Sequence, residues 1–81
     1  MRSDQEIIQL FKESVREVDT NAKLGNVTAG TELAQLGLDS VMTMEVIGVM
    51  EEKLNLRFPD EELATLKRIG DLTKLVQRLA A

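Results

Sequence analysis

The chain has 81 residues, of which 43% are hydrophobic and 30% charged, and its formal net charge at pH 7 is −4. These values predict one small folded domain over residues 1–81 and exclude a disordered chain. The absence of Cys and His excludes disulfides, the usual zinc ligands and Ser–His or Cys–His nucleophile pairs. Catalysis by this chain alone is therefore not expected.

The charge and the lack of long apolar runs also bear on the partners. Nucleic-acid binding requires clustered Lys and Arg, whereas an acidic chain favours a basic protein partner. No apolar run approaches the roughly 20 residues of a membrane span, and the N-terminal sequence MRSDQEII lacks the apolar stretch of a signal peptide. We therefore expect a cytoplasmic monomer that binds neither nucleic acid nor membranes.

The first predicted helix runs from Ser3 to about Val18 or Asp19. Ser3 and Glu6 form the S-x-x-E pattern of a capping box, and apolar residues follow at helical spacing. These residues are Ile7, Ile8, Phe11, Val15 and Val18.

A long ordered loop is predicted over residues 20–37. Gly and Asn recur through it, and no helical or alternating period survives more than a few residues. A connection of this length in a small domain should be functional or pinned to the core. The apolar residues available as pins are Val27, Leu33, Leu36 and Leu38.

The second predicted helix spans Asp39 to Leu54 and begins inside the sequence LGLDSVMTMEV. Asp39 and Ser40 are both capping residues, although one cap is sufficient to start a helix. If Asp39 is the N-cap, the Ser40 hydroxyl is free in the first turn, where the positive end of the helix dipole favours an attached phosphate. Simple capping is the alternative explanation of the pair.

This second helix carries apolar residues on two sides. One side is an ordinary core stripe, formed by Val46, Ile47, Met50 and Leu54. Apolar residues on the outward side indicate either a docking surface for partner proteins or a face partly covered by the preceding loop. The outward ridge consists of Val41, Glu45, Gly48 and Glu52, and it is flanked by Met42, Met44 and Val49.

Two further helices complete an all-α fold. A short third helix opens at Pro59, which suits a helix start, and it ends before Arg68. The last helix carries Asp71 in its first turn and Arg78 in its last turn. Its apolar stripe consists of Ile69, Leu72, Leu75, Val76 and Leu79. The sequence therefore predicts a small bundle of three main helices plus one short helix.

The motif LGLDSV resembles the corresponding motif of the acyl carrier proteins, the carriers of fatty acid, polyketide and related assembly lines. The similarity extends over almost the whole chain. It includes the long first loop, the acidic EEK at the end of the second helix, FPDEE at the third and IGDLTKLVQRL in the last. The resemblance implies a four-helix bundle of the acyl carrier protein type.

The resemblance also implies a role for individual residues. The modified serine of the family falls on Ser40, and Asp39 matches the acidic residue before it. A separate phosphopantetheinyl transferase would use coenzyme A and a divalent metal to attach 4′-phosphopantetheine to Ser40, and the thiol of this arm would carry the cargo as a thioester. Further implied partners are an acyl- or aminoacyl-loading ligase or transferase and synthase enzymes with basic docking patches. The partner-binding positions implied by the family are Val41, Met44, Glu45, Gly48, Glu52 and Leu66. Of these, Leu66, together with Ile69, falls where the family has residues near the arm or the apolar pocket between helices, although core packing is the ordinary role of both.

Some positions depart from the family pattern. Met42 stands where fatty-acid carriers commonly have an acid, Gly48 replaces a larger apolar residue, and Arg68 replaces a frequent Ser or Thr cap. The motif LGLDS leans toward the acyl and polyketide carriers rather than the peptidyl carriers. The sequence does not identify the cargo, while Met1 and the polar first helix favour a stand-alone protein over a domain cut from a synthase.

Two other functions are compatible with parts of the sequence. An unmodified helical interaction module would bind a partner through the same ridge without a prosthetic group, and its function would survive Ser40→Ala. An enzyme would need an acid–base pair such as Glu45 with Glu52, although these carboxylates are more simply explained as a solvated face.

Overall fold

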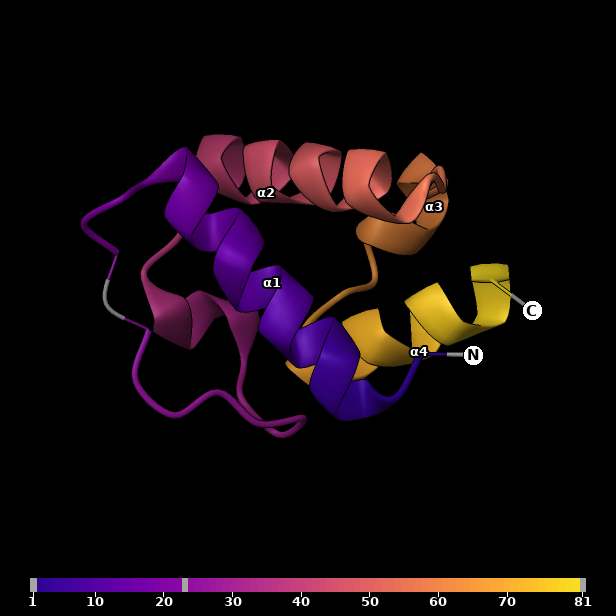
Figure 1. The fold of residues 1–81 in the computed structure, drawn as a ribbon, viewed down its shortest axis with the longest axis horizontal. Coiled ribbons are helices and arrows are strands. Elements are labelled where there is room, and N and C mark those ends of the chain that lie inside the picture. The colour runs from indigo at the N-terminus through magenta and orange to yellow at the C-terminus, as the bar shows by residue number, and fades with distance from the viewer. Residues whose placement is uncertain (1, 23, 81) are drawn as a thin grey trace.

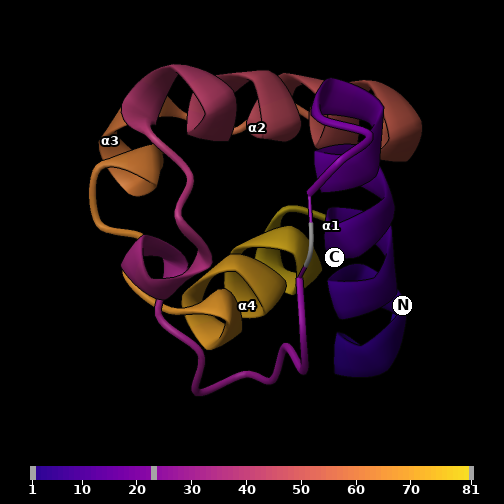
Figure 2. The same ribbon diagram turned by 90° about the vertical axis from the view of Figure 1, so that its left-hand side faces the viewer.

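The computed structural model describes residues 2–22 and 24–80, and it confirms the predicted all-α bundle of three main helices and one short helix (Figure 1). In the views of Figures 1 and 2, α2 lies across one end of α1, and α4 lies beside α1. The elements are α1 (Asp4–Val18), the 3₁₀ turn η1 (Leu33–Leu36), α2 (Ser40–Leu54), α3 (Asp60–Leu63) and α4 (Ile69–Ala80).

The start of α1 confirms the predicted capping box. The Glu6 backbone N–H donates to Ser3 Oγ at 3.2 Å, and the Ser3 N–H donates to Glu6 Oε1 at 3.0 Å. Two N–H groups at the helix start are thus satisfied by side chains. The helix ends at Val18, within the predicted boundary, where the Asp19 N–H donates to the Val15 carbonyl.

The apolar stripes of α1, α2 and α4 meet in one core. Val46 and Met50 of α2 are fully buried, as the periodicity predicts, while Leu54 at its end is half-buried. Side chains from the first loop and from the turn before α3 complete the core. Its buried members are Ile7, Ile8, Phe11, Val15, Leu24, Val27, Val46, Ile47, Met50, Phe58, Ile69, Leu72, Leu75 and Val76.

The long first loop is pinned to the core as predicted, but it is not wholly irregular. Val27 is buried, and the other three predicted pins are half-buried against the core. Leu24 is a further buried pin that the sequence pattern did not reveal. The prediction of a loop without helical structure was wrong for Leu33–Leu36, which form η1. A single turn is too short to produce a hydrophobic period.

The same loop is joined by its backbone to the segment before α4, and Figure 2 shows the two segments running side by side. Three N–H groups donate to carbonyls across this junction: Leu33 to Lys67 at 2.8 Å, Ile69 to Thr31 at 2.9 Å and Gly70 to Ala29 at 2.8 Å.

This junction explains how α4 begins without a Ser or Thr cap. Its first two N–H groups, at Ile69 and Gly70, donate to loop carbonyls instead of to a capping side chain. The close approach here favours a glycine, because a Cβ at Gly70 would lie 3.1 Å from the Ala29 carbonyl oxygen, a tight contact. The Asp71 Oδ2 accepts from the N–H groups of Lys67 at 3.1 Å and Arg68 at 3.0 Å.

The connection from α2 to α3 is ordered by one carboxylate. Asn55 ends α2 in the left-handed region with φ of 55°, and Glu51 Oε2 then accepts from the Phe58 N–H at 2.7 Å. Pro59 occupies the N-cap position, so α3 starts one residue later than predicted and ends at Leu63. Pro fits this position because it has no N–H to satisfy.

Polar contacts between the elements lie on the surface. Ion pairs at 2.6 Å join Lys53 to Glu17 and Arg78 to Glu62, and such exposed pairs contribute little to stability. Gln77 Nε2 donates to Asp4 Oδ1 at 2.7 Å, which holds the end of α4 against the start of α1. Among the helices of residues 2–22 and 24–80, none has both the length and the apolar character needed to cross a membrane.

Asp71→Ala should lower stability at neutral pH, and this loss should disappear in acid. The N–H groups of Arg68 and Lys67 hold the pKa of the Asp71 carboxyl below its ordinary value of 3.8. A group whose folded pKa is lowered stabilises the fold above its ordinary pKa and loses this contribution as the pH falls through the folded pKa. Urea unfolding at pH 7 and at about pH 2 measures both limits.

Glu61→Ala is the control, since it removes an exposed carboxylate from another helix start. A wild-type unfolding midpoint for Asp71→Ala at pH 7 would contradict the role assigned to this carboxylate.

Candidate functional site

The start of α2 is built by Gly37 and Asp39. Gly37 has φ of 73°, a left-handed conformation that favours glycine, and it turns the chain away from η1. Asp39 is the N-cap, because its Oδ1 accepts from the Met42 N–H at 2.7 Å. Thr43 Oγ1 donates to the Asp39 carbonyl at 2.8 Å. Asp39 as N-cap is the condition under which the sequence analysis leaves the Ser40 hydroxyl free, and the structure meets this condition.

Ser40 is the first residue of α2, and its side chain is exposed. Within the described ranges 2–22 and 24–80, no group is hydrogen-bonded to its hydroxyl. Its Oγ is thus available for covalent attachment to a group held at the positive end of the helix dipole. An unactivated serine is a weak nucleophile. The chain has no His or Cys that could form a Ser–His or Cys–His pair.

The outward ridge of α2 is exposed along its length. Val41 and Met44 retain 69% and 54% of their accessible surface, and Glu45, Gly48 and Glu52 are also exposed. The flanking residues Met42 and Val49 are half-buried, so Val41 and Met44 are the exposed apolar residues on this side of the helix. Exposed apolar groups beside carboxylates form a surface suited to a partner with both apolar and basic groups.

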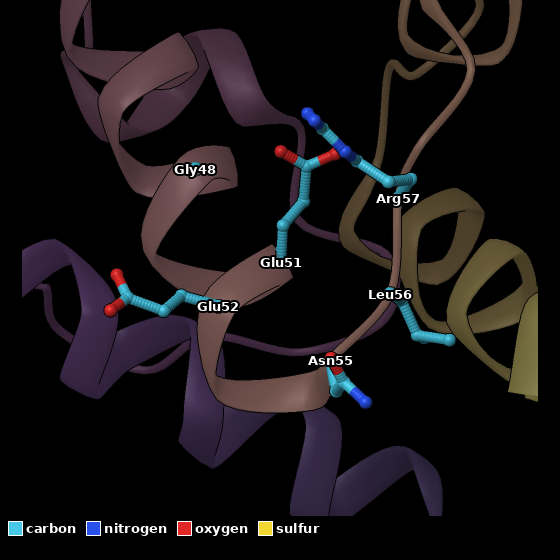
Figure 3. A pocket seen from close by; sticks show the side chains of 6 residues that line it. All are labelled: Gly48, Glu51, Glu52, Asn55, Leu56 and Arg57. Atoms are coloured by element: carbon cyan, nitrogen blue, oxygen red, sulfur yellow. The ribbon is translucent and has the colours of Figure 1, made fainter.

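A groove lies beside the C-terminal half of this ridge (Figure 3). Its volume is about 370 Å³. In Figure 3, Glu51 and Arg57 reach toward one side of the groove, and Glu52 points away from them. The Glu51 carboxylate accepts a hydrogen bond from the Phe58 N–H. The Glu52 carboxylate does not take part in this bond. The lining residues are Gly48, Glu51, Glu52, Asn55, Leu56 and Arg57.

A smaller apolar pocket lies inside the bundle, beneath the first half of α2. Its volume is about 70 Å³. Thr43 and Met44 belong to its lining and follow Ser40 by three and four residues, which places them one turn along the same side of the helix. The complete lining is Phe11, Leu33, Thr43, Met44, Ile47, Leu63, Leu66 and Leu72.

The structure therefore separates the residues that the sequence groups together. Val41, Glu45, Gly48 and Glu52 form the exposed ridge, whereas Leu66 is half-buried and lies at the apolar pocket. Met44 belongs to both places. The resemblance places Leu66 near the arm or an apolar pocket between helices, and Leu66 does line this pocket. The complete lining was not predicted, because it comes from four helices and two loop segments and leaves no local sequence signal. In the part of the chain that the structure describes, no cluster of three or more His, Cys, Asp or Glu residues could hold a metal ion.

Comparisons with known proteins agree with this geometry. A family model for the phosphopantetheine attachment site matches residues 5–76. The chain is similar to the meromycolate extension acyl carrier protein of Mycolicibacterium aurum, with 35% identity over 95% of this chain and 79% of that protein. It is also similar to the acyl carrier protein of Arthrobacter sp. strain FB24, with 33% identity and both chains covered completely.

Solved structures show the same arrangement of helices. The crystal structure of an acyl carrier protein from Thermotoga maritima has a TM-score of 0.86 and 25% identity, covering 95% of this chain and 89% of that one. A second similar chain is found in the crystal structure of the curacin biosynthetic pathway HMG synthase in complex with acetyl donor-ACP. Its TM-score is 0.75 and its identity 31%, over 99% of this chain and all of that one.

Gly48→Ala should stabilise the fold by about 0.5–1 kcal/mol. A Cβ at this helical position would meet nothing within 4 Å, so the only expected effect is the better helix propensity of Ala. The free energy of unfolding in urea measures the change.

Gly37→Ala is the matched control with the opposite expected sign. A Cβ there would also meet nothing within 4 Å, but the φ of 73° is unfavourable for Ala, and we expect a loss of about 1–2 kcal/mol. A destabilised Gly48→Ala variant would show that α2 does not have open space at this position.

Proposed function

This chain belongs to the acyl carrier protein family, the carriers that bear phosphopantetheine, and we propose that Ser40 is its attachment residue. The proposed role is to shuttle thioester-bound acyl, polyketide or aminoacyl intermediates between enzymes of a biosynthetic pathway. The observation that carries this proposal is the exposed and unbonded Ser40 hydroxyl beside the Asp39 cap. The family match supports it, since residues 5–76 include this position.

Attachment requires little from this chain beyond the serine oxygen. Ser40 Oγ would form a bond to the phosphorus that bears the pantetheine part of coenzyme A, and the bond from that phosphorus to the departing 3′,5′-ADP would break. The Ser40 proton would pass to a base on the phosphopantetheinyl transferase, which also supplies the divalent metal site. Because the hydroxyl has no hydrogen bond to lose within the described residues, the reaction leaves the helix start intact.

The start of α2 fits a phosphate ester at this residue. The first-turn N–H groups carry the positive end of the helix dipole, which favours a negative group there. Asp39 holds the turn through its bond to the Met42 N–H and keeps Ser40 as the first helical residue. When attached, 4′-phosphopantetheine supplies the terminal thiol that holds the cargo as a thioester. The chain supplies the attachment point and the docking surface.

The ridge of α2 is the proposed docking surface for these enzymes. Val41 and Met44 provide exposed apolar contacts next to Ser40, and Glu45 and Glu52 provide negative charge along the same side. A basic patch on a synthase or on a loading ligase or transferase would match these charges. The complex of an HMG synthase with the similar acetyl donor-ACP supports synthases as partners.

Incubation with coenzyme A, magnesium and a broad-specificity phosphopantetheinyl transferase should add one phosphopantetheinyl group to the wild type and none to Ser40→Ala. Intact-protein mass spectrometry measures the increment, and circular dichroism confirms that both proteins are folded. An increment that persists in Ser40→Ala would move the attachment to another residue. A folded wild type without any increment would favour the unmodified interaction module.

Glu45→Lys should leave the fold intact and reduce the efficiency of priming by roughly two- to tenfold at low salt. The reason is that a lysine on the ridge would repel a basic partner, and this repulsion should weaken at high salt. The measurement is kcat/KM for the transferase at two salt concentrations.

Glu13→Lys makes the same charge change at an exposed position on α1 and serves as the control. Equal losses in the two variants would indicate an effect of net charge and would argue against docking on the ridge.

A further inference from the structure

Positive charge is concentrated near the C-terminus of this acidic chain. Residues 64–81 carry four cations and one carboxylate, a formal side-chain charge of +3, whereas residues 1–63 carry six cations and thirteen carboxylates, a charge of −7. A local excess of positive charge in an acidic chain marks a candidate surface for an anionic partner. The four cations are Lys67, Arg68, Lys74 and Arg78.

The structure places these cations around two hollows that adjoin at Leu66. One hollow lies between α3 and α4, has a volume of about 230 Å³ and is lined in part by Lys74 and Arg78. The other lies between η1 and the segment before α4, has a volume of about 300 Å³ and is lined in part by Lys67 and Arg68. Leu66 lines both. We refer to the two hollows together as the α3–α4 groove. In Figure 2, η1 and α3 lie on the side of the molecule away from α1.

The groove also contains apolar surface. Leu33 and Ala34 of η1 line one hollow, Leu75 of α4 lines the other, and Leu66 joins them. Leu33 and Leu66 are half-buried and Ala34 is exposed, so part of this surface is open to a ligand. Apolar surface among cations suits a ligand that carries both carboxylates and apolar groups.

Two of the four cations are available for a ligand. The two arginines already face carboxylates, since one is paired with Glu62 at 2.6 Å and the other lies 3.9 Å from Glu32. Lys67 and Lys74 are exposed and belong to none of the ion pairs among residues 2–22 and 24–80. Asp71 lies between them in the sequence, but its carboxylate accepts from two backbone N–H groups.

The carboxylates of the groove discriminate between kinds of anionic partner. Glu32, Glu62 and Asp71 interrupt its positive charge, and the whole chain has a net charge of −4. Duplex DNA and anionic membranes present dense, continuous negative charge, which these carboxylates would repel. A protein segment has separate carboxylates, which can lie over the lysines and avoid the carboxylates of the groove.

We propose that the α3–α4 groove binds an acidic protein segment in which carboxylates alternate with apolar residues. Its carboxylates pair with Lys67 and Lys74, and its apolar side chains contact Leu66 and the surface beside it. The ridge of α2 contributes no residue to the lining of either hollow. One protein could therefore hold the carrier at this groove while another docks on the ridge.

The test uses a peptide with blocked ends in which glutamates alternate with leucines. A length of about eight residues spans roughly 25 Å when extended. The peptide is titrated into the isotope-labelled full chain, and amide chemical shifts report the dissociation constant and the site. We expect a Kd below about 1 mM at low salt, weaker binding at high salt, and the largest shifts around residues 66–68 and 74–78. Oligoglutamate of the same length should bind more weakly, because it lacks the apolar contacts.

Lys67→Glu and Lys74→Glu should each raise the Kd by roughly three- to tenfold. Both side chains are exposed, so the variants should fold, and circular dichroism checks this. Arg16→Glu makes the same charge change at an exposed position on α1. This control should keep the Kd within about twofold of the wild-type value, since screening by salt weakens distant charges.

Equal losses of affinity in all three variants, or shifts centred on α2, would overturn the inference. The absence of binding at peptide concentrations above about 1 mM would overturn it as well. Tighter binding to anionic vesicles or to duplex DNA than to the peptide, lost in the two lysine variants, would overturn it by making the ligand a lipid or a nucleic acid. Priming of Ser40 is measured separately by mass, so its failure would remove the proposed function without deciding the role of the groove.

Discussion

The backbone pairing between the first loop and the start of α4 is the contact on which the site depends. The N–H groups of Ile69 and Gly70 are satisfied only when the loop carbonyls are in place, and unsatisfied N–H groups at a helix start are costly when they are buried. The same loop brings Leu33 to the pocket wall and leads through Gly37 to the cap of α2. The position of Ser40 thus depends on a contact made near the end of the chain.

The outward side of α2 has an unusual composition for a solvent-exposed helix face. A helix that is apolar on several sides is normally buried on several sides, but here Val41 and Met44 remain mostly exposed. Their neighbour Gly48 has open space around it, and a glycine inside a helix is less stable than an alanine. Met44 also lines the apolar pocket, whereas no packing among the described residues accounts for Val41 or Gly48. The docking of partner proteins that is proposed for this ridge would account for these two residues.

Local patterns in the sequence were sufficient for the helices. The capping box at Ser3 and the apolar stripe through Val46 and Met50 are confirmed because both depend on residues within a few turns of each other. The same is true of the Asp39 cap. The turn η1 and the loop junction with α4 could not be predicted, since one is too short to show a period and the other joins backbone groups about forty residues apart.

The candidate site also has one part that local sequence patterns predict and one part that they do not. The exposure of the ridge follows from helical periodicity, whereas the pocket depends on how Leu33 and Leu66 approach α2 from separate segments. The resemblance places Leu66 near the arm or an apolar pocket between helices, and it lies at the pocket wall and not on the ridge. The volume of a pocket is a property of packing, and small shifts of side chains decide it.

The bond between Gln77 and Asp4 has an architectural consequence. It brings the end of α4 to the start of α1, and Figure 1 shows both on the right, while α2 begins on the left. A tether, tag or neighbouring domain attached on this side would approach the molecule from the side opposite the start of α2, where Ser40 lies. The carrier could therefore be anchored to a solid support, or placed within a larger assembly, while its serine and its docking ridge remain free to visit successive enzymes.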